Sequence, residues 1–250
     1  MKIVVAMKQV PDLTQLRFRD GRPVLGDAVQ TYGDLDKNAL EAAVRLKEAG
    51  LDAEIVVLSV GSDELEDTAK EALASGADSA YLLVDEEFAN LDPCETASLI
   101  AKAVGEVGDV DLVLMGEGSG DNYSGQMAGR VSEVLAWPQL GFAGSIAVSD
   151  GRALIERFLE DRIETVSAEL PAVVSVVADI NEVRIPAVTQ ILKAGRKPKE
   201  VLDAQDVGFK GAADPLVNVL SSVAPENKRE GKVLGSVEEL VAFIKDRNVL

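Results

Sequence analysis

The sequence predicts an α/β fold: a doubly wound, mostly parallel, Rossmann-like sheet with a small antiparallel addition and a C-terminal arm plus helix. The run 3–7 is wholly apolar, and the run 110–115 is apolar except for Asp111; such runs are typical of parallel strands buried on both faces. Segments with helical periodicity separate these runs, and repeated strand–helix–strand units form one sheet with right-handed crossovers. We therefore expect the functional site at the carboxyl ends of the strands, near the switch in strand order.

The elements follow in chain order. Apolar runs predict strands at 3–7, 54–60, 80–84, 110–115, 140–148 and 172–177. The alternating segments 153–159 and 163–168 predict an antiparallel pair. Helices are expected between these strands, and the one after the glycine-rich loop at 116–126 has four apolar residues at helical spacing: Met127, Val131, Val134 and Leu135.

Local signals mark the ends of several elements. The pair Asp20-Gly21 predicts the turn of a hairpin over 16–25. Asp92-Pro93 predicts a helix start with a capping acid and a proline at the first helical position, running to about Val104. Asp36 and Ser62 are interpreted as caps of the first two helices, the second of which stops near Gly76, and Ser236 with Glu239 as a capping box of the last helix.

The alternation of strand and helix signals ends after residue 180, and this change predicts that the chain has two parts. Residues 1–180 form the nucleotide-binding α/β domain, and 181–250 form a recognition loop, an extended arm and a terminal helix. The segment 200–232 is polar and shows little periodicity, so it is expected to be an arm or linker and not a core element. The terminal helix has an apolar face that has to dock on this chain or on a partner.

Composition excludes several function classes. The chain has no histidine, which rules out Ser-His-Asp triads, Cys-His pairs and imidazole metal sites; we predict no catalytic residue and no metal site. The net charge of −18 argues against nucleic acid and anionic membranes as partners. A single cysteine, Cys94, and the lack of a membrane-length apolar run lead us to expect a cytoplasmic protein.

The glycine-rich loop after the strand at 110–115 is the strongest functional signal. Gly116, Gly118 and Gly120 allow a close backbone approach, and Asn122 and Ser124 can contact a phosphate or ribose. Lys8, at the end of the first strand, can face the same phosphate, although taken alone it is better explained as a strand-end lysine in solvent. The other interpretation is an ordinary turn with Asn122 or Ser124 as a helix cap, and spacing alone does not separate the two. The fingerprints of nicotinamide dehydrogenases and P-loop NTPases are both missing.

A basic cluster stands out in the acidic chain, formed by Arg184, Lys193, Arg196, Lys197 and Lys199. A solvated face is the usual explanation for such a cluster. In a chain of this charge, docking against an acidic partner or a phosphate is the better interpretation.

Several segments together resemble the beta subunit of an electron transfer flavoprotein. They are 4–12, 38–47, 72–78, 111–116, 121–126, 137–139, 170–174, 181–184 and 193–199. The resemblance covers nearly the whole chain. It implies a heterodimer with a larger alpha subunit that holds FAD, and AMP or a second FAD in the beta subunit. The nucleotide would contact Ala6, Val60, Asp121, Ser124, Gly125, Gln126 and Met127; Gly33 stands where many relatives have a contacting asparagine, and Tyr123 where many have an aspartate.

The resemblance also implies partners. The stretch from Arg184 to Lys197 would grip flavin dehydrogenases, with Val188 in place of the usual anchoring leucine. The arm and last helix would embrace the alpha subunit. Electrons would pass from acyl-CoA type dehydrogenases to a quinone reductase, or from NADH in a bifurcating complex. The alternatives are a stand-alone, universal-stress-like nucleotide-binding protein and an adenylating enzyme, although the Ser-Gly-Gly loop of the latter is absent.

Overall fold

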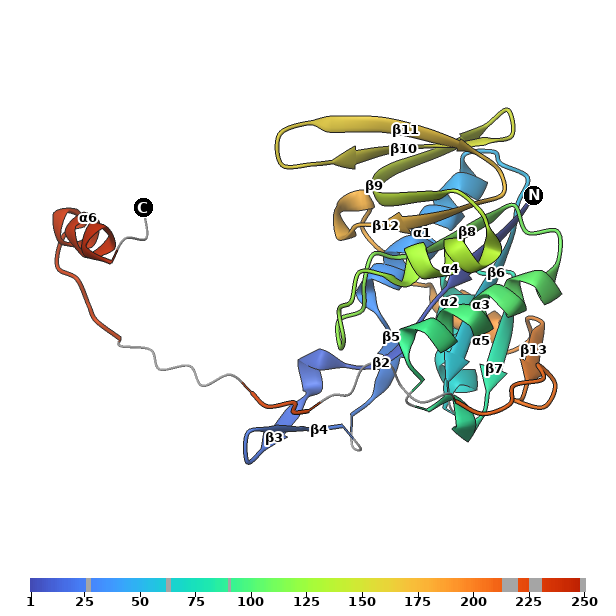
Figure 1. Ribbon diagram of the computed structural model, residues 1–250, viewed down its shortest axis with the longest axis horizontal. Helices are drawn as coiled ribbons and strands as arrows, with labels where there is room; N and C mark the ends of the chain where they lie inside the picture. The colour runs from blue at the N-terminus through green and yellow to red at the C-terminus, as the bar shows by residue number, and fades with distance from the viewer. Residues whose placement is uncertain (26–27, 62–63, 90, 213–219, 225–230, 248–250) are drawn as a thin grey trace.

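A nine-stranded sheet forms the centre of the computed structural model, which describes residues 1–25, 28–61, 64–89, 91–212, 220–224 and 231–247 (Figure 1). Seven strands are parallel, in the order β9 (Gln139–Ser149), β12 (Ala172–Val176), β8 (Leu112–Gly116), β1 (Lys2–Ala6), β6 (Glu54–Gly61), β7 (Ser79–Val84) and β13 (Lys199–Leu202). The antiparallel strands β10 (Arg152–Phe158) and β11 (Ile163–Glu169) extend the sheet beyond β9. The predicted fold class is confirmed.

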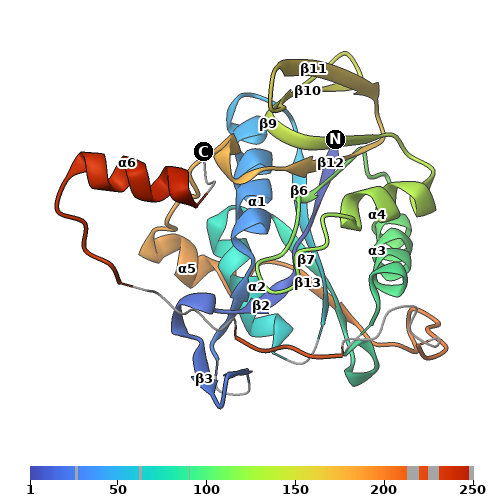
Figure 2. The ribbon, with the colours of Figure 1, turned by 60° about the vertical axis from the view of Figure 1, so that its left-hand side comes forward.

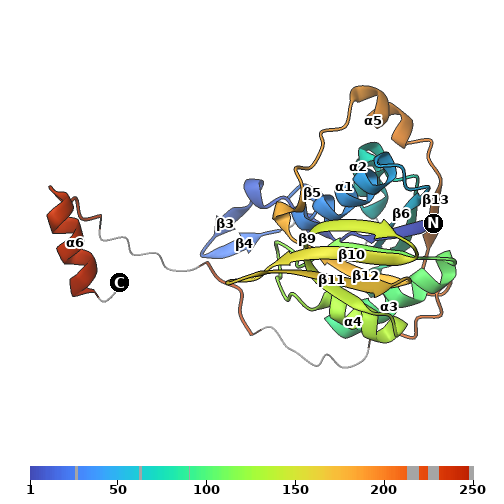
Figure 3. The same cartoon turned by 90° about the horizontal axis from the view of Figure 1, so that it is seen from above.

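Helices cover both faces of the sheet. Figures 2 and 3 show α1 (Asp34–Glu48), α2 (Leu65–Ser75) and α5 (Val188–Ala194) on one side, and α3 (Pro93–Val107) and α4 (Met127–Leu135) on the other. Successive residues of β1 serve the two layers: Ile3 and Val5 join the core under α1 and α2, whereas Val4 and Ala6 join the core under α3 and α4. Burial on both faces explains why this strand is apolar throughout.

Most predicted element ends are confirmed. In the hairpin of β3 (Arg17–Arg19) and β4 (Arg22–Val24), Asp20 and Gly21 have φ of +50° and +72°. A turn with two positive φ values matches the twist of paired strands, and glycine adopts it without strain. Asp92 accepts the backbone N–H groups of Cys94 and Glu95 at 2.7 and 2.9 Å and thereby caps α3. The predicted cap Ser62 lies outside the described residues.

Two expectations about elements were wrong. Asp36 lies in the first turn of α1, where Gly33 is the N-cap, and its side chain bonds elsewhere. The start of the predicted arm contains β13, which pairs in parallel with β7, and Ala204 and Val207 after it are buried. Tertiary contacts with β7 and α3 fix this short segment, and its own sequence pattern is too short to reveal them.

The remaining elements are small. β2 (Gln9–Pro11) and β5 (Gln30–Tyr32) form a two-stranded sheet, and single turns of 3-10 helix occupy η1 (Leu13–Gln15), η2 (Glu86–Phe88) and η3 (Ala178–Ile180). The terminal helix α6 (Val237–Asp246) starts at Ser236 as predicted, with no buried residue, and lies apart from the sheet (Figure 1). None of the described helices is long and apolar enough to cross a membrane.

Candidate functional site

A cavity of about 410 Å³ opens at the carboxyl ends of β1, β6 and β8. The chain crosses from β1 to β6 on one side and later places β8 on the other side of β1, so the cavity lies at the switch in strand order. Parallel α/β sheets bind their ligands at this position. Its volume falls within the range of small-molecule sites.

The walls of the cavity differ in polarity. One part is apolar and comes from Met7, Leu58, Phe88, Leu91, Ile100 and Met115. The loop after β8 supplies a polar part with Ser119, Asn122 and Ser124. A flat apolar ring and a polar or charged tail can therefore occupy the two parts at once.

Most residues predicted to bind a cofactor line this cavity: Ala6, Lys8, Val60, Gly116, Asn122, Ser124, Gly125 and Met127. Three others lie nearby. Gly33 is the N-cap of α1 and donates its N–H to the backbone oxygen of Lys8 at 3.1 Å. Gln126 accepts a hydrogen bond from Arg130 at 2.8 Å, and Asp121 pairs with Lys8.

Asp36 holds two strand ends together at the edge of the cavity. Its carboxylate accepts the N–H of Lys8 after β1 at 2.7 Å and the N–H of Gly116 at the end of β8 at 3.0 Å. The side chain is buried, and burial disfavours its charged form. The two hydrogen bonds favour the charged form, but burial outweighs them and raises the pKa of Asp36 to about 6. Sequence reasoning missed Asp36 as a site residue because its partners are backbone groups far away along the chain.

The glycines of the loop have packing roles. A Cβ on Gly116 would lie 2.6 Å from the Cβ of Leu35, so glycine lets α1 approach β8 closely. A Cβ on Gly118 would lie 2.5 Å from the ring of Tyr123. Gly125 has a φ of +65°. The turn interpretation therefore explains part of the glycine pattern, and the cavity beside the turn is what favours a ligand.

An ion pair joins Lys8, just after β1, to Asp121 in the loop after β8. The Nζ atom of Lys8 lies 2.7 Å from Oδ2 of Asp121, and their side chains are 48% and 27% exposed. Burial disfavours the charge of Asp121 and is the largest single influence on its pKa. The hydrogen bond and charge of Lys8, together with hydrogen bonds from Ser119 and the backbone, outweigh burial and lower the pKa of that carboxyl. An ion pair this exposed stabilises the fold by at most about 1 kcal/mol. A phosphate can therefore replace Asp121 as the partner of the Lys8 ammonium group at little cost in stability.

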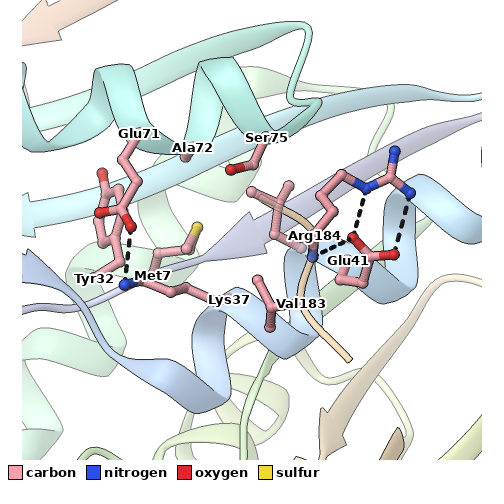
Figure 4. Close-up of a pocket in the computed structure, with 10 residues that line it drawn as sticks. Met7, Tyr32, Lys37, Glu41, Glu71, Ala72, Ser75, Val183 and Arg184 are labelled. Atoms are coloured by element: carbon pink, nitrogen blue, oxygen red, sulfur yellow. Dashed lines mark hydrogen bonds and ion pairs between the residues drawn. The ribbon is translucent and has the colours of Figure 1, made fainter. Parts of the chain in front are cut away.

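The second predicted region is the anchored segment, residues 181–197. Arg184 donates to Glu41 at 2.6 Å (Figure 4), and the Glu41 side chain is only 4% exposed. Arg184 also donates to Glu48 at 2.7 Å. Burial disfavours the charged form of Glu41. The hydrogen bonds from Arg184 and Arg45 together outweigh the effect of burial and lower the pKa of Glu41. The cavity of about 10 Å³ beside these residues has room for one water and not for a cofactor.

The other end of the anchored segment is held by Lys197. Its ammonium group donates to the backbone oxygens of Leu73 and Ala77 at 2.7 and 2.5 Å, where α2 ends. A cation is favourable at the C-terminal end of a helix. The middle of the segment exposes Val188 to 73%, together with three apolar residues that the sequence reading did not single out: Ile185, Ile191 and Leu192. Lys193 and Arg196 are also exposed.

Among the described residues, no group of acidic or cysteine side chains is arranged to hold a metal ion. A sequence model of the electron transfer flavoprotein domain matches residues 28–207. The match covers more than half of the 250 residues and includes both the loop after β8 and the anchored segment.

Proposed function

The chain belongs to the electron transfer flavoprotein family, and we propose that it is the beta subunit of a heterodimeric electron carrier. The cavity at the switch in strand order supports the proposal most directly, because it provides a nucleotide-sized site where this sheet type binds ligands. The apolar side chains of Val237, Leu240 and Val241, which α6 exposes, support a heterodimer.

We propose that the cavity binds AMP, or the AMP moiety of a second FAD. The adenine ring would lie against the apolar wall, near Ala6 and Val60. The phosphate would lie by the glycine-rich loop, within reach of Ser124 and the ammonium group of Lys8. The two-part lining and the volume of about 410 Å³ fit such a group. A flavin, when bound, supplies the electron chemistry, and the residues of this chain position it.

Electron transfer requires no general base, which suits a chain without histidine. In our proposal, the alpha subunit holds the FAD that accepts electrons from an acyl-CoA type dehydrogenase and passes them to a quinone reductase. A second FAD in the cavity would instead permit bifurcation of electrons from NADH. We propose a cytoplasmic location, based on the single cysteine.

We propose that the anchored segment docks the dehydrogenase. Its exposed aliphatic side chains, Ile185, Val188, Ile191 and Leu192, are of the kind that form the centre of protein interfaces. Arg184 and Lys197 make intramolecular contacts at its two ends. They would therefore fix the segment, whereas Lys193 and Arg196 remain free to meet an acidic partner.

A count of bound cofactors tests the proposal. The chain is co-expressed with its alpha subunit and the complex is purified, and FAD and AMP are quantified after acid release. One FAD and one AMP per heterodimer support an ordinary carrier, and two FAD support bifurcation. A colourless homodimer that binds ATP would contradict the proposal and favour a stand-alone, universal-stress-like protein. Release of pyrophosphate from ATP would contradict it in favour of an adenylating enzyme.

A further inference from the structure

The hairpin of β3 and β4 concentrates positive charge on one face. Its strands pair Arg17 with Val24, Phe18 with Pro23, and Arg19 with Arg22. Since side chains alternate across a strand, Arg17, Arg19 and Arg22 share one face and Phe18 lies on the other. Arg19 and Arg22 are direct cross-strand neighbours, an arrangement that destabilises a strand pair by charge repulsion.

These arginines form no ion pair in the described part of the chain. None of the three guanidinium groups forms an ion pair or hydrogen bond with the described residues, although the chain carries 43 acidic residues and a net charge of −18. The hairpin is also a separate two-stranded sheet, and such sheets are marginally stable in water. An external anion would relieve the repulsion and hold the hairpin in place.

The position of the hairpin indicates which anionic partner its three arginines can meet. None of the three arginines lines the cavity, so the bound nucleotide is not their partner. At the tip, the oxygen of Gly21 accepts the N–H of Ala224, from the C-terminal arm, at 2.7 Å. Figures 1 and 3 show the hairpin projecting from the body of the molecule on the side where the arm leads to α6. A polypeptide held by the arm therefore lies next to the hairpin.

We propose that the face formed by Arg17, Arg19 and Arg22 binds an acidic surface of the polypeptide that the C-terminal arm holds. The identity of that polypeptide as the alpha subunit rests on the proposed function. The net negative charge of the whole chain would repel an acidic partner. The arginine face of the hairpin would attract such a partner locally. Ion pairs between these three arginines and carboxylates of the partner would speed association and set the orientation of the partner.

The dissociation constant of the purified heterodimer tests this proposal. The variant Arg17→Gln/Arg19→Gln/Arg22→Gln is compared with Lys70→Gln/Arg152→Gln/Arg162→Gln, which removes the same charge from residues paired with carboxylates elsewhere. We expect the hairpin variant to raise the dissociation constant about tenfold at low salt and less at high salt, and the control to leave it within about twofold. The nucleotide content of both variants should equal that of the wild type.

A second variant separates docking from a structural role. Arg19→Glu places opposite charges across the strands and should slow amide exchange in the hairpin, yet raise the dissociation constant about tenfold. An unchanged dissociation constant in both hairpin variants would overturn the proposal. Variants that lose the nucleotide while their dissociation constant stays the same would overturn it too. A wild-type chain that forms no heterodimer would overturn the proposed function as well, whereas a heterodimer insensitive to these changes would overturn only the role of the hairpin.

Discussion

The cavity and the anchored segment are held in place in opposite ways. At the cavity, the short buried side chain of Asp36 joins two strand ends through backbone N–H groups. In the anchored segment, the long side chains of Arg184 and Lys197 reach across to α1 and α2. In both regions the groups that fix the geometry are engaged within the chain, so ligand and partner contacts fall to the neighbouring residues that remain exposed.

The largest effect is expected from Asp36. Asp36→Leu leaves the N–H groups of Lys8 and Gly116 without their acceptor, which should lower the free energy of unfolding by about 3 kcal/mol at pH 5. The bound nucleotide should be lost because the strand ends separate. Urea unfolding and nucleotide release measure the two effects, with Asp34→Leu on the exposed side of the same turn as the control. A stable variant that retains its nucleotide would show that Asp36 does not hold the strand ends together.

The same residue predicts a dependence on pH. Its folded pKa of about 6 lies above the ordinary 3.8, so the folded state binds the proton more tightly than the unfolded state. Ionisation of Asp36 therefore reduces stability as the pH rises through about 4 to 6. The stability difference between wild type and Asp36→Leu should shrink by about 1 kcal/mol from pH 5 to pH 7.5. A constant difference across this range would contradict the buried carboxyl described here.

A smaller effect is expected at the end of the anchored segment. Arg184→Met removes the main partner of the buried Glu41 carboxylate and should cost about 2 kcal/mol of stability, measured by urea unfolding. Arg45→Met is the matched control, because Arg45 is 52% exposed and should cost less than about 1 kcal/mol. In assays with the dehydrogenase, Arg184→Met should raise KM and leave kcat unchanged. Equal effects of both variants would argue against a special anchoring role for Arg184.

The exposed apolar residues should affect docking without affecting stability. Val188→Ser/Leu192→Ser is expected to raise KM for the dehydrogenase about tenfold, since each side chain loses apolar contact area in the complex. Its unfolding should stay within about 0.5 kcal/mol of wild type. Val134→Ser, an exposed valine on α4, is the control and should change neither quantity. If both variants change KM equally, the docking surface lies elsewhere.

The sequence predicted the fold wherever the pattern was local. Buried parallel strands are apolar runs, and the ends of α3 and the β3–β4 hairpin carry their own capping and turn residues. The position of the cavity followed from the topology. The pattern could not show that Asp36 bonds two distant backbone groups, or that β13 would pair with β7. It also could not distinguish a cation that binds a partner from one that anchors its own chain, as Arg184 does.

The most direct test of the account is the adenine nucleotide released by acid from the purified complex, compared with the complex of Thr96→Trp. Thr96 lines the cavity from α3, so a tryptophan there should fill the space without disturbing the strand ends. We predict one adenine nucleotide or second FAD per wild-type chain and none in the folded variant. A wild-type chain without nucleotide, or a variant that keeps it, would contradict the assignment of this cavity.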